Sequence, residues 1–411
     1  MSTTTEPAGP VALLGRPVRP AAAPGSPGQV LALVRAHGEL TRAELVELTG
    51  TSRSTVAARL DALVDAGLLA EVTPVATTRG RPPTRFRFRE EGGVLALADA
   101  GATGVRVAVT DLGGRILHQQ RHDLPVGIGP EPWLTEVLGH LDDALRRVGV
   151  TRAEVHGVGL ALPGPVDGDA GTVVSPPIMT GWDRFPIRDW FAEHLPCPVV
   201  VENDANAMAV GEHRSAHADR SSMLLLKLAT GVGAGLVIGG SVYRGFDGAA
   251  GDIGHIQVTA PDEGPAPACR CGNTGCIEAY AGGWALIRDL RAAGHDVSSV
   301  PEVVALVKAG DPSATALSRR AGRFIGIALS DAVSLLNPEV VVIGGDLAAA
   351  ADHLFAGIRE SVYARSLPLA TRRLTILPSS QGDLAGLHGL AAAVADRLYA
   401  PERVDAIVAA G

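Results

Sequence analysis

Three cysteines within a short run constrain this chain more than any other feature. Cys269, Cys271 and Cys276 lie in the run CRCGNTGC, in which Gly272 and Gly275 let the backbone fold tightly around a small ion. Three thiols in one turn-rich loop are typical of a metal site in a reducing compartment, not of a disulfide framework. A closed tetrahedral site needs one further ligand.

The fourth ligand is expected from the segment just upstream. His255, in the run GDIGH, completes a Cys3His donor set of the kind that holds structural zinc. The alternative is that the three cysteines stay reduced and serve only the packing of the loop. We predict that one structural Zn²⁺ is bound by His255, Cys269, Cys271 and Cys276.

The first part of the chain divides into a leader and a small domain. Residues 1–27 are rich in Pro, Ala, Thr and Gly and have no apolar periodicity, which predicts a disordered leader. Residues 28–90 then show three short helical patterns. The second begins at the capping box formed by Thr41 and Glu44, and Ser52 is expected to cap the third.

Two short strands are expected after these helices, within residues 71–88 and around a Gly/Pro turn. Three helices followed by a hairpin predict a winged helix-turn-helix DNA-binding domain over residues 28–90. The alternative is a protein-interaction module whose arginines are only a solvated face. The residues expected to contact DNA, from the third helix and the wing, are Ser52, Arg53, Ser54, Thr55, Arg59, Arg79, Arg81 and Arg85.

After Gly93 the sequence pattern predicts alternating strands and helices, as in an α/β domain. Buried strands such as 94–98, 223–228 and 340–343 alternate with helical segments, and glycine hairpins at 99–114 and 230–245 suggest a duplicated architecture. Asn203 and Asp204 follow a buried strand, where open α/β sheets gather ligand-binding groups, and adjacent amide and carboxylate groups suit a sugar ring. The alternative is a polar cap at the strand end.

The run GDIGH followed by CRCGNTGCIE resembles the signature of the ROK family (repressor, open reading frame, kinase), which is E-x-G-H followed by C-x-C-G-x-x-G-C-x-E. The resemblance covers residues 28–400. It implies a two-lobed actin/hexokinase-like ATPase (sugar kinase) fold with structural zinc, placed after the winged helix-turn-helix domain. The expected lobes are residues 91–203 plus about 386–403, and residues 204–385 with the zinc site and a dimerisation surface.

The resemblance also implies roles for individual residues. The implied sugar-binding residues are Asn203, Asp204, Asp252, His255 and Glu278, and Asp204 would be the catalytic base if kinase activity is retained. The implied nucleotide-binding residues lie in two phosphate hairpins and an adenosine-side turn: Asp99, Gly101, Thr103, Thr230, Gly231, Gly233, Gly344 and Gly345.

Three positions depart from the family pattern. Asp252 stands where the family usually has Glu, Gly104 where its kinases commonly carry Lys or Arg, and Pro177 where they tend to have a sugar-binding Asn. Phosphoryl transfer relies on positioning and charge stabilisation, so the loss of a cation at position 104 would be costly for a kinase.

The overall charge limits the function classes. A net charge of −8 and a pI of about 5.8 exclude polyanion binding by the whole surface, so DNA contact must come from the locally basic segment. No apolar run is long enough to span a bilayer, which predicts a cytoplasmic protein without membrane partners.

Three functions fit these observations. We expect a transcriptional regulator, of the repressor type, of carbohydrate-metabolism genes. It would act as a homodimer or dimer of dimers on a double-stranded DNA operator and respond to a small sugar or sugar-phosphate effector. The alternatives are an ATP- and Mg²⁺-dependent sugar kinase of the glucose type, and a bifunctional kinase-repressor. The helix-turn-helix segment favours the regulator, because kinases of this family resemble only the part of the chain after about Gly92.

Overall fold

The computed structural model describes residues 25–72, 83–259 and 264–410. The chain divides into two compact units, one made of Met1–Arg89 with Tyr399–Gly411 and the other of Glu90–Leu398. Most of the expected leader, together with Arg79 and Arg81, falls outside the described residues. Among the described helices, none has both the length and the apolar character needed to cross a membrane.

The first unit has the winged helix architecture that the sequence predicts. Its three strands form one antiparallel sheet in the order β1-β3-β2. Its N-terminal elements are α1 (Pro27–His37), β1 (Leu40–Thr41), α2 (Arg42–Thr49), α3 (Arg53–Asp65), β2 (Leu69–Val72) and β3 (Arg85–Phe88).

Local capping explains where the helices of this unit begin. The Thr41 side chain accepts the Glu44 N–H while the Glu44 carboxylate accepts the Thr41 N–H, so both halves of the predicted capping box are present before α2. The Ser52 hydroxyl accepts the Thr55 N–H at 3.1 Å and caps α3, as expected. Gly50 ends α2 in the left-handed conformation, which fixes the tight turn between the two helices.

The last helix of the chain belongs to this same unit. In α14 (Pro401–Ala410), Val404 is fully buried, and the Asp405 carboxylate accepts the Gly28 N–H at 2.7 Å. The ring of Tyr399, just before this helix, packs edge-on against Phe88 with centroids 4.9 Å apart. The first turn of α1 and the end of β3 are therefore covered by residues from the opposite end of the sequence.

This finding changes the expected domain boundary. Residues to about 403 were expected in the first lobe, whereas the structure places the chain from Tyr399 onward in the winged helix unit. The physical reason is burial: Tyr399 is 6% exposed and Val404 is fully buried, against α1 and β3.

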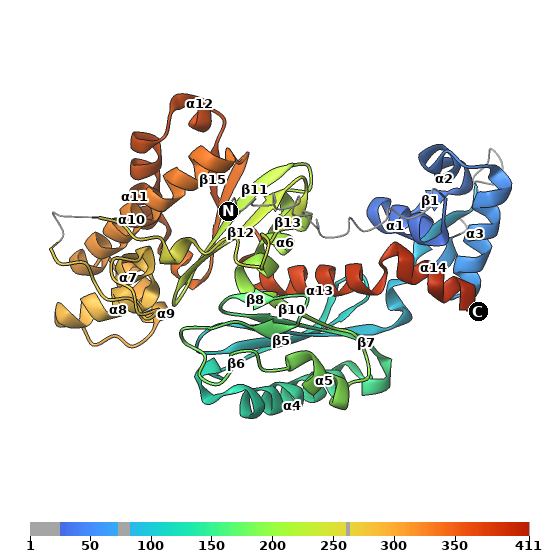
Figure 1. The fold of residues 1–411 in the computed structure, drawn as a ribbon, viewed down its shortest axis with the longest axis horizontal. Coiled ribbons are helices and arrows are strands. Elements are labelled where there is room, and N and C mark those ends of the chain that lie inside the picture. Colours follow the sequence, from blue (N-terminus) through green and yellow to red (C-terminus); the bar gives the residue numbers. More distant parts are fainter. Residues whose placement is uncertain (1–24, 73–82, 260–263, 411) are drawn as a thin grey trace, which may run out of the picture. The chain divides into compact units, whose positions relative to one another are not determined.

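The second unit contains two five-stranded sheets with the same topology (Figure 1). The first has the order β10-β7-β4-β5-β6 and the second the order β13-β12-β11-β14-β15, so each combines an antiparallel meander with two parallel strands. The first sheet consists of β4 (Val94–Ala100), β5 (Val105–Asp111), β6 (Ile116–His122), β7 (Val155–Leu162) and β10 (Val199–Asn203); the second of β11 (Ser222–Leu228), β12 (Val232–Ile238), β13 (Ser241–Tyr243), β14 (Val340–Gly344) and β15 (Thr375–Pro378).

The sheets bury separate cores beneath amphipathic helices. In the first, α4 (Pro130–Val148) covers β5 and β6 and buries Trp133, while α5 (Ile187–His194) packs on β10. Beside the second sheet, α7 (Ile277–Ala281), α8 (Gly283–Ala292), α9 (Val300–Lys308), α10 (Pro312–Leu336) and α11 (Ala351–Arg365) form the larger core, and α12 (Pro368–Thr371) follows them. A small hairpin of β8 (Val166–Asp167) and β9 (Thr172–Val173) completes the described strands of this unit.

Two helices join the sheets through an unusually close crossing. Helix α6 (Asp204–Ala216) packs on β11 and β12, and α13 (Ala385–Leu398) packs on β4 and β7. A Cβ atom added to Gly389 would lie 1.7 Å from the Ala207 carbonyl oxygen, and one added to Gly211 would lie 1.9 Å from the Ala385 carbonyl oxygen. Only glycine at these two positions allows the helices to approach to backbone contact.

We predict that Val404→Asp loosens the winged helix unit while Ile407→Asp does not. Val404 is fully buried and Ile407 is 43% exposed on the same helix, so only the first substitution buries an unpaired carboxylate, at a cost of roughly 3 kcal/mol. Hydrogen exchange of the α1 amides should accelerate in Val404→Asp alone. Equal protection of α1 in the two variants would contradict the role given to α14.

Candidate functional site

The residues predicted to bind metal come together in the structure. One donor atom from each of His255, Cys269, Cys271 and Cys276 lies within 4.8 Å of the other three. The Cys271 and Cys276 sulfurs are 3.8 Å apart, and the Cys269 sulfur is 3.7 Å from His255 Nδ1. Two thiolates bound at about 2.3 Å to one tetrahedral ion lie about 3.8 Å apart, so this cluster could hold a metal ion.

The loop reaches this geometry through its two glycines. Gly272 and Gly275 have φ values of 94° and 76°, which side chains with a Cβ rarely adopt. The Cys269 N–H donates to the Asn273 carbonyl at 2.7 Å and closes the turn. Burial raises the pKa of the Cys276 thiol to about 12, with contributions from the neighbouring thiols, so a bound cation would be needed to ionise all three sulfurs together.

His255 connects this cluster with a large cavity. Its Nδ1 faces the Cys269 sulfur, while its Nε2 lies 4.0 Å from the Asp252 carboxylate on the opposite side of the ring. Both Asp252 and His255 line the cavity, whose volume is about 400 Å³. A metal ion on Nδ1 would therefore fix the orientation of a ring that also forms part of the cavity wall.

The cavity opens where strands of both sheets end, as expected for a ligand site in open α/β sheets. All five residues predicted to bind sugar line it, and so do all the predicted nucleotide residues except Gly344, which lies at the end of β14 against Met208 and Ser379. The predicted residues in the wall are Asn203, Asp204, Asp252, His255 and Glu278, with Asp99, Gly101, Thr103, Thr230, Gly231, Gly233 and Gly345. Gly104 and Pro177, which with Asp252 are the three departures from the family pattern, line it as well.

Asn203 has two structural roles in addition to its place in the wall. Its Oδ1 accepts the Asn206 N–H at 3.0 Å and caps α6, and its Nδ2 donates to the Gly164 carbonyl at 2.9 Å. The strand-end cap considered as an alternative is therefore present. The cap also holds the amide at the edge of the cavity, so the two interpretations are compatible.

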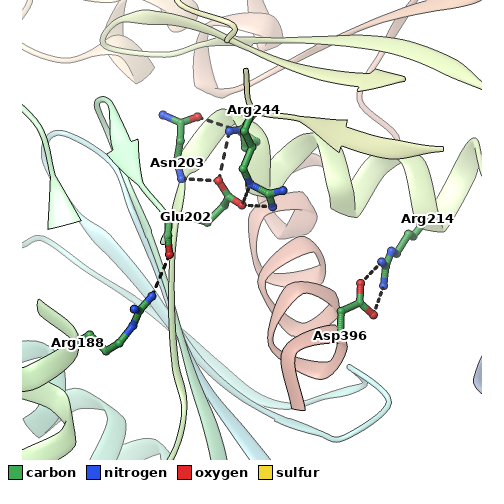
Figure 2. A network of polar contacts seen from close by, with 8 residues as sticks. Arg188, Glu202, Asn203, Arg214, Arg244 and Asp396 are labelled. Atoms are coloured by element: carbon green, nitrogen blue, oxygen red, sulfur yellow. Dashed lines mark hydrogen bonds and ion pairs between the residues drawn. The ribbon is translucent and has the colours of Figure 1, made fainter. Parts of the chain in front are cut away.

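An ion pair braces the strand beneath Asn203 (Figure 2). The Glu202 carboxylate accepts the Arg244 Nε–H at 2.9 Å and the Asn203 N–H at 3.0 Å, and the Glu202 side chain is only 6% exposed. Glu202 belongs to β10 of the first sheet, whereas Arg244 follows β13 of the second. Figure 2 also shows Arg214 of α6 paired with Asp396 of α13. These two ion pairs link the halves of the second unit on either side of the helix crossing.

Glu278 is held rigidly at the other side of the cavity. Its two carboxylate oxygens accept the Val232 N–H at 3.0 Å and the Trp284 Nε1–H at 3.1 Å. Asp204, the predicted catalytic base, has both oxygens engaged as well: one accepts the Ala205 N–H at 2.8 Å and the other accepts the Lys227 ammonium at 2.6 Å. Lys227 was not singled out by the sequence analysis.

Several further charged residues in the wall also escaped the sequence analysis. They are Arg106, Arg121, Arg270, Asp346 and Asp383. For Lys227 a signal exists, because it is the single charged residue of the apolar strand β11 and lies just before the glycine hairpin at 230–233. The arginines carry no such signal, since an isolated arginine on a polar strand or loop is ordinarily solvated.

The third helix of the winged helix unit presents the predicted DNA-contacting residues. Ser52, Arg53, Ser54 and Arg59 are exposed, and Thr55 is half-buried. Arg85, predicted as a wing contact, instead donates to the Glu39 carbonyl at 2.9 Å and lies 3.8 Å from the Glu44 carboxylate. Its guanidinium is thus tied into the unit, next to the start of α2.

Comparison with known proteins agrees with this architecture. The profile of the MarR family matches residues 24–79, and the profile of the ROK family matches residues 95–397. The chain is a member of the ROK family. A solved ROK family transcriptional regulator, described as a homologue of the E. coli MLC protein, matches with a TM-score of 0.79 and 26% identity, over 94% of this chain and 98% of that one.

Two further relatives differ in how much of this chain they match. The xylose repressor of Bacillus spizizenii is 27% identical over 359 residues, which cover 87% of this chain and 91% of the repressor. A ROK family glucokinase from Streptomyces griseus, solved with glucose and AMPPNP, matches with a TM-score of 0.65 and 30% identity, over 74% of this chain and 99% of the glucokinase. The regulators therefore match most of this ROK chain, whereas the kinase leaves about a quarter of it unmatched.

The half-buried residue Asp99 makes the stability of the fold depend on pH. Burial raises the pKa of Asp99 to about 6; Lys227 opposes this rise and Asp204 adds to it. The folded protein therefore binds a proton between about pH 4 and 6 that the unfolded chain does not bind, so ionised Asp99 destabilises the fold above pH 6 and this penalty is lost as the pH falls.

We predict that Asp99→Asn is more stable than the wild type at pH 7.5 and that its advantage shrinks by on the order of 1 kcal/mol at pH 5. Chemical denaturation at the two pH values measures the difference. Asp383→Asn, which removes an exposed carboxylate from the same rim, serves as the control and should show a smaller change with pH. An advantage of Asp99→Asn that is the same at the two pH values would show that Asp99 ionises normally, and the proposed pKa shift would be wrong.

Proposed function

We propose that this protein is a sugar-responsive transcriptional repressor of carbohydrate-metabolism genes. The observation that carries the proposal is the presence, on one chain, of a winged helix unit with an exposed third helix and a ROK unit with a polar cavity. A recognition helix places its N-terminal residues against base edges in the major groove, which assigns Ser52, Arg53, Ser54, Thr55 and Arg59 to the operator.

The cavity provides the effector site. Its carboxylate and amide groups, on Asn203, Asp204, Asp252 and Glu278, suit the hydroxyls of a sugar, and His255 adds a ring nitrogen. We place the effector between the two sheets, so that its binding favours one closure of the ROK unit. In a homodimer, this closure sets the spacing of two recognition helices, which must match half-sites about 34 Å apart or a multiple of that distance.

A structural zinc ion fits the Cys3His cluster. Cys269, Cys271 and Cys276 would supply thiolates and His255 its Nδ1, a donor set and spacing that zinc prefers. The ion would hold the loop 269–276 and the His255 ring in place, and it would take no chemical part in a reaction, because four protein ligands leave no open position.

A second candidate function is ATP-dependent phosphorylation of the sugar. Asp204 lies in the cavity with both glycine hairpins, and a ROK glucokinase matches the second unit. This function would require Asp204 to accept a proton from the sugar hydroxyl that is phosphorylated. It accounts for the cavity but leaves the winged helix unit without a role.

Metal analysis tests the zinc proposal. We predict that Cys271→Ser loses the metal and unfolds at a lower temperature than the wild type, because one of four ligands is removed, whereas Cys197→Ser keeps it. Cys197 is half-buried and lies outside the cluster, so it controls for the loss of a thiol. Stoichiometric zinc in purified Cys271→Ser, or none in the wild type, would contradict the proposal.

Operator binding tests the regulatory proposal. Duplexes enriched by the wild-type protein from a random DNA library provide the probe, and fluorescence anisotropy gives the affinity. We predict that Arg53→Ala weakens binding about 10- to 100-fold, because a base contact from the recognition helix is lost. Arg147→Ala removes the same charge from the exposed end of α4 in the other unit and should leave affinity unchanged.

The effector is sought on the same complex. Addition of D-xylose, D-glucose, amino sugars or their phosphates should change the affinity for at least one member of the panel. If no duplex is enriched and the protein turns over ATP rapidly in the presence of sugar, the proposed repressor function is wrong and the kinase function is supported.

A further inference from the structure

Lys227 is a lysine near the C-terminal end of the apolar strand β11. Its ammonium donates to Asp204 Oδ2 at 2.6 Å, and the two side chains are 15% and 12% exposed. The other residues of β11 from Met223 to Leu228 are apolar and fully buried. A lysine in such a strand is costly unless its charge is paired, so its position calls for a specific explanation.

The charges of three carboxylates act on this ammonium. Besides Asp204, the charges of Asp99 and Asp346 act on Lys227, and each of the three follows or ends a different strand of the two sheets. Burial alone would lower the pKa of Lys227, but these carboxylates outweigh it and raise the pKa, so the side chain stays cationic. Lys227 is thus a positive charge that shares the cavity wall with these acidic residues and pairs with one of them.

These residues occupy the part of the cavity where the two glycine hairpins meet the predicted base. Asp99 begins the first hairpin, Thr230 and Gly231 begin the second, and all three line the cavity with Asp204 and Lys227. Phosphoryl transfer from ATP requires Mg²⁺ at such a place, held by carboxylates and bridging the phosphates. Here the Asp204 oxygen that would be a metal ligand already accepts the Lys227 ammonium at 2.6 Å, so a Mg²⁺ ion could bind there only by breaking this ion pair.

We propose that Lys227 is a resident cation that takes the place of Mg²⁺–nucleotide and makes the cavity a receptor for an uncharged sugar. This inference rests on the proposed regulatory function and names its ligand class. The sugar hydroxyls donate to the carboxylates that remain accessible, and Asp204 serves as part of a fixed ion pair instead of as a base.

The charge of the wall also disfavours a phosphorylated sugar. Six carboxylates line the cavity against four cationic side chains, one of which, Arg106, is already paired with Asp383 at 2.9 Å. A phosphate dianion would therefore enter a wall with an excess of negative charge. An uncharged sugar has no such penalty, so of the two effector classes considered above the structure favours the free sugar.

Titration calorimetry on the full-length protein tests the proposal. The wild type should show no binding of Mg²⁺–AMPPNP at 1 mM, with or without D-glucose or D-xylose, and no ATP turnover with either sugar. Binding of Mg²⁺–AMPPNP below 1 mM, or turnover, would overturn the proposal whatever the variants do. A sugar phosphate that binds at least 10-fold more tightly than its free sugar would overturn the ligand class.

Two substitutions isolate the charge of Lys227. Lys227→Met keeps most of the length of the side chain but removes its charge from Asp204. Mn²⁺, followed by electron paramagnetic resonance, should therefore bind at least 10-fold more tightly to this variant than to the wild type. Lys227→Arg retains the charge and should bind Mn²⁺ as weakly as the wild type. Equal Mn²⁺ affinity in Lys227→Met and the wild type, with both folded by thermal unfolding, would contradict the resident-cation role.

The outcomes remain separate from those of the regulatory proposal. Operator binding and its response to free sugars decide whether the protein is a repressor, and they do not depend on Mg²⁺. A repressor that also binds Mg²⁺–AMPPNP would retain the proposed function and lose the role given to Lys227.

Discussion

The contact on which the second unit depends is the crossing of α6 and α13. Gly211 and Gly389 bring the two helix backbones together, so that α6 carries the sheet containing β11 and α13 carries the sheet containing β4. The residues that face the cavity project from the ends of these same elements: Asp204 begins α6, and Gly386 of α13 lies against the Asp99 carboxylate. A shift along the crossing would therefore move both sides of the cavity, and packed helices of this kind slide only by small amounts.

The sequence predicted features that depend on neighbouring residues. The capping box of Thr41 and Glu44 and the cap of Ser52 are local hydrogen bonds, and they appear where the sequence places them. The cysteine cluster is nearly as local, because three of its four candidate ligands lie in one loop and two glycines fix the turn. The duplicated architecture was visible in the two glycine hairpins, since each follows the first strand of its own sheet.

Features that depend on distant residues were missed or misjudged. In the sequence, Lys227 is only a single charge in an apolar strand. Asp204, Asp99 and Asp346 act on it because the fold brings the ends of four strands together, and the sequence does not show this. The bond of Arg85 to the Glu39 carbonyl likewise joins residues far apart in the sequence, and it leaves the predicted DNA contact of Arg85 a prediction. The assignment of Tyr399 failed for the same reason, because its aromatic partner Phe88 lies more than three hundred positions earlier in the chain.

The discontinuous winged helix unit has a consequence for the order in which the protein is made. The hydrogen bond between Gly28 and Asp405 joins residues 377 positions apart, so the ribosome releases α1 long before it releases the helix that covers it. At ordinary rates of synthesis this interval lasts on the order of tens of seconds. During that time the apolar surface of α1 and β3 stays uncovered, and the unit is completed only when the whole ROK unit has been synthesised. Completion of the winged helix unit is thereby tied to synthesis of the chain through α14.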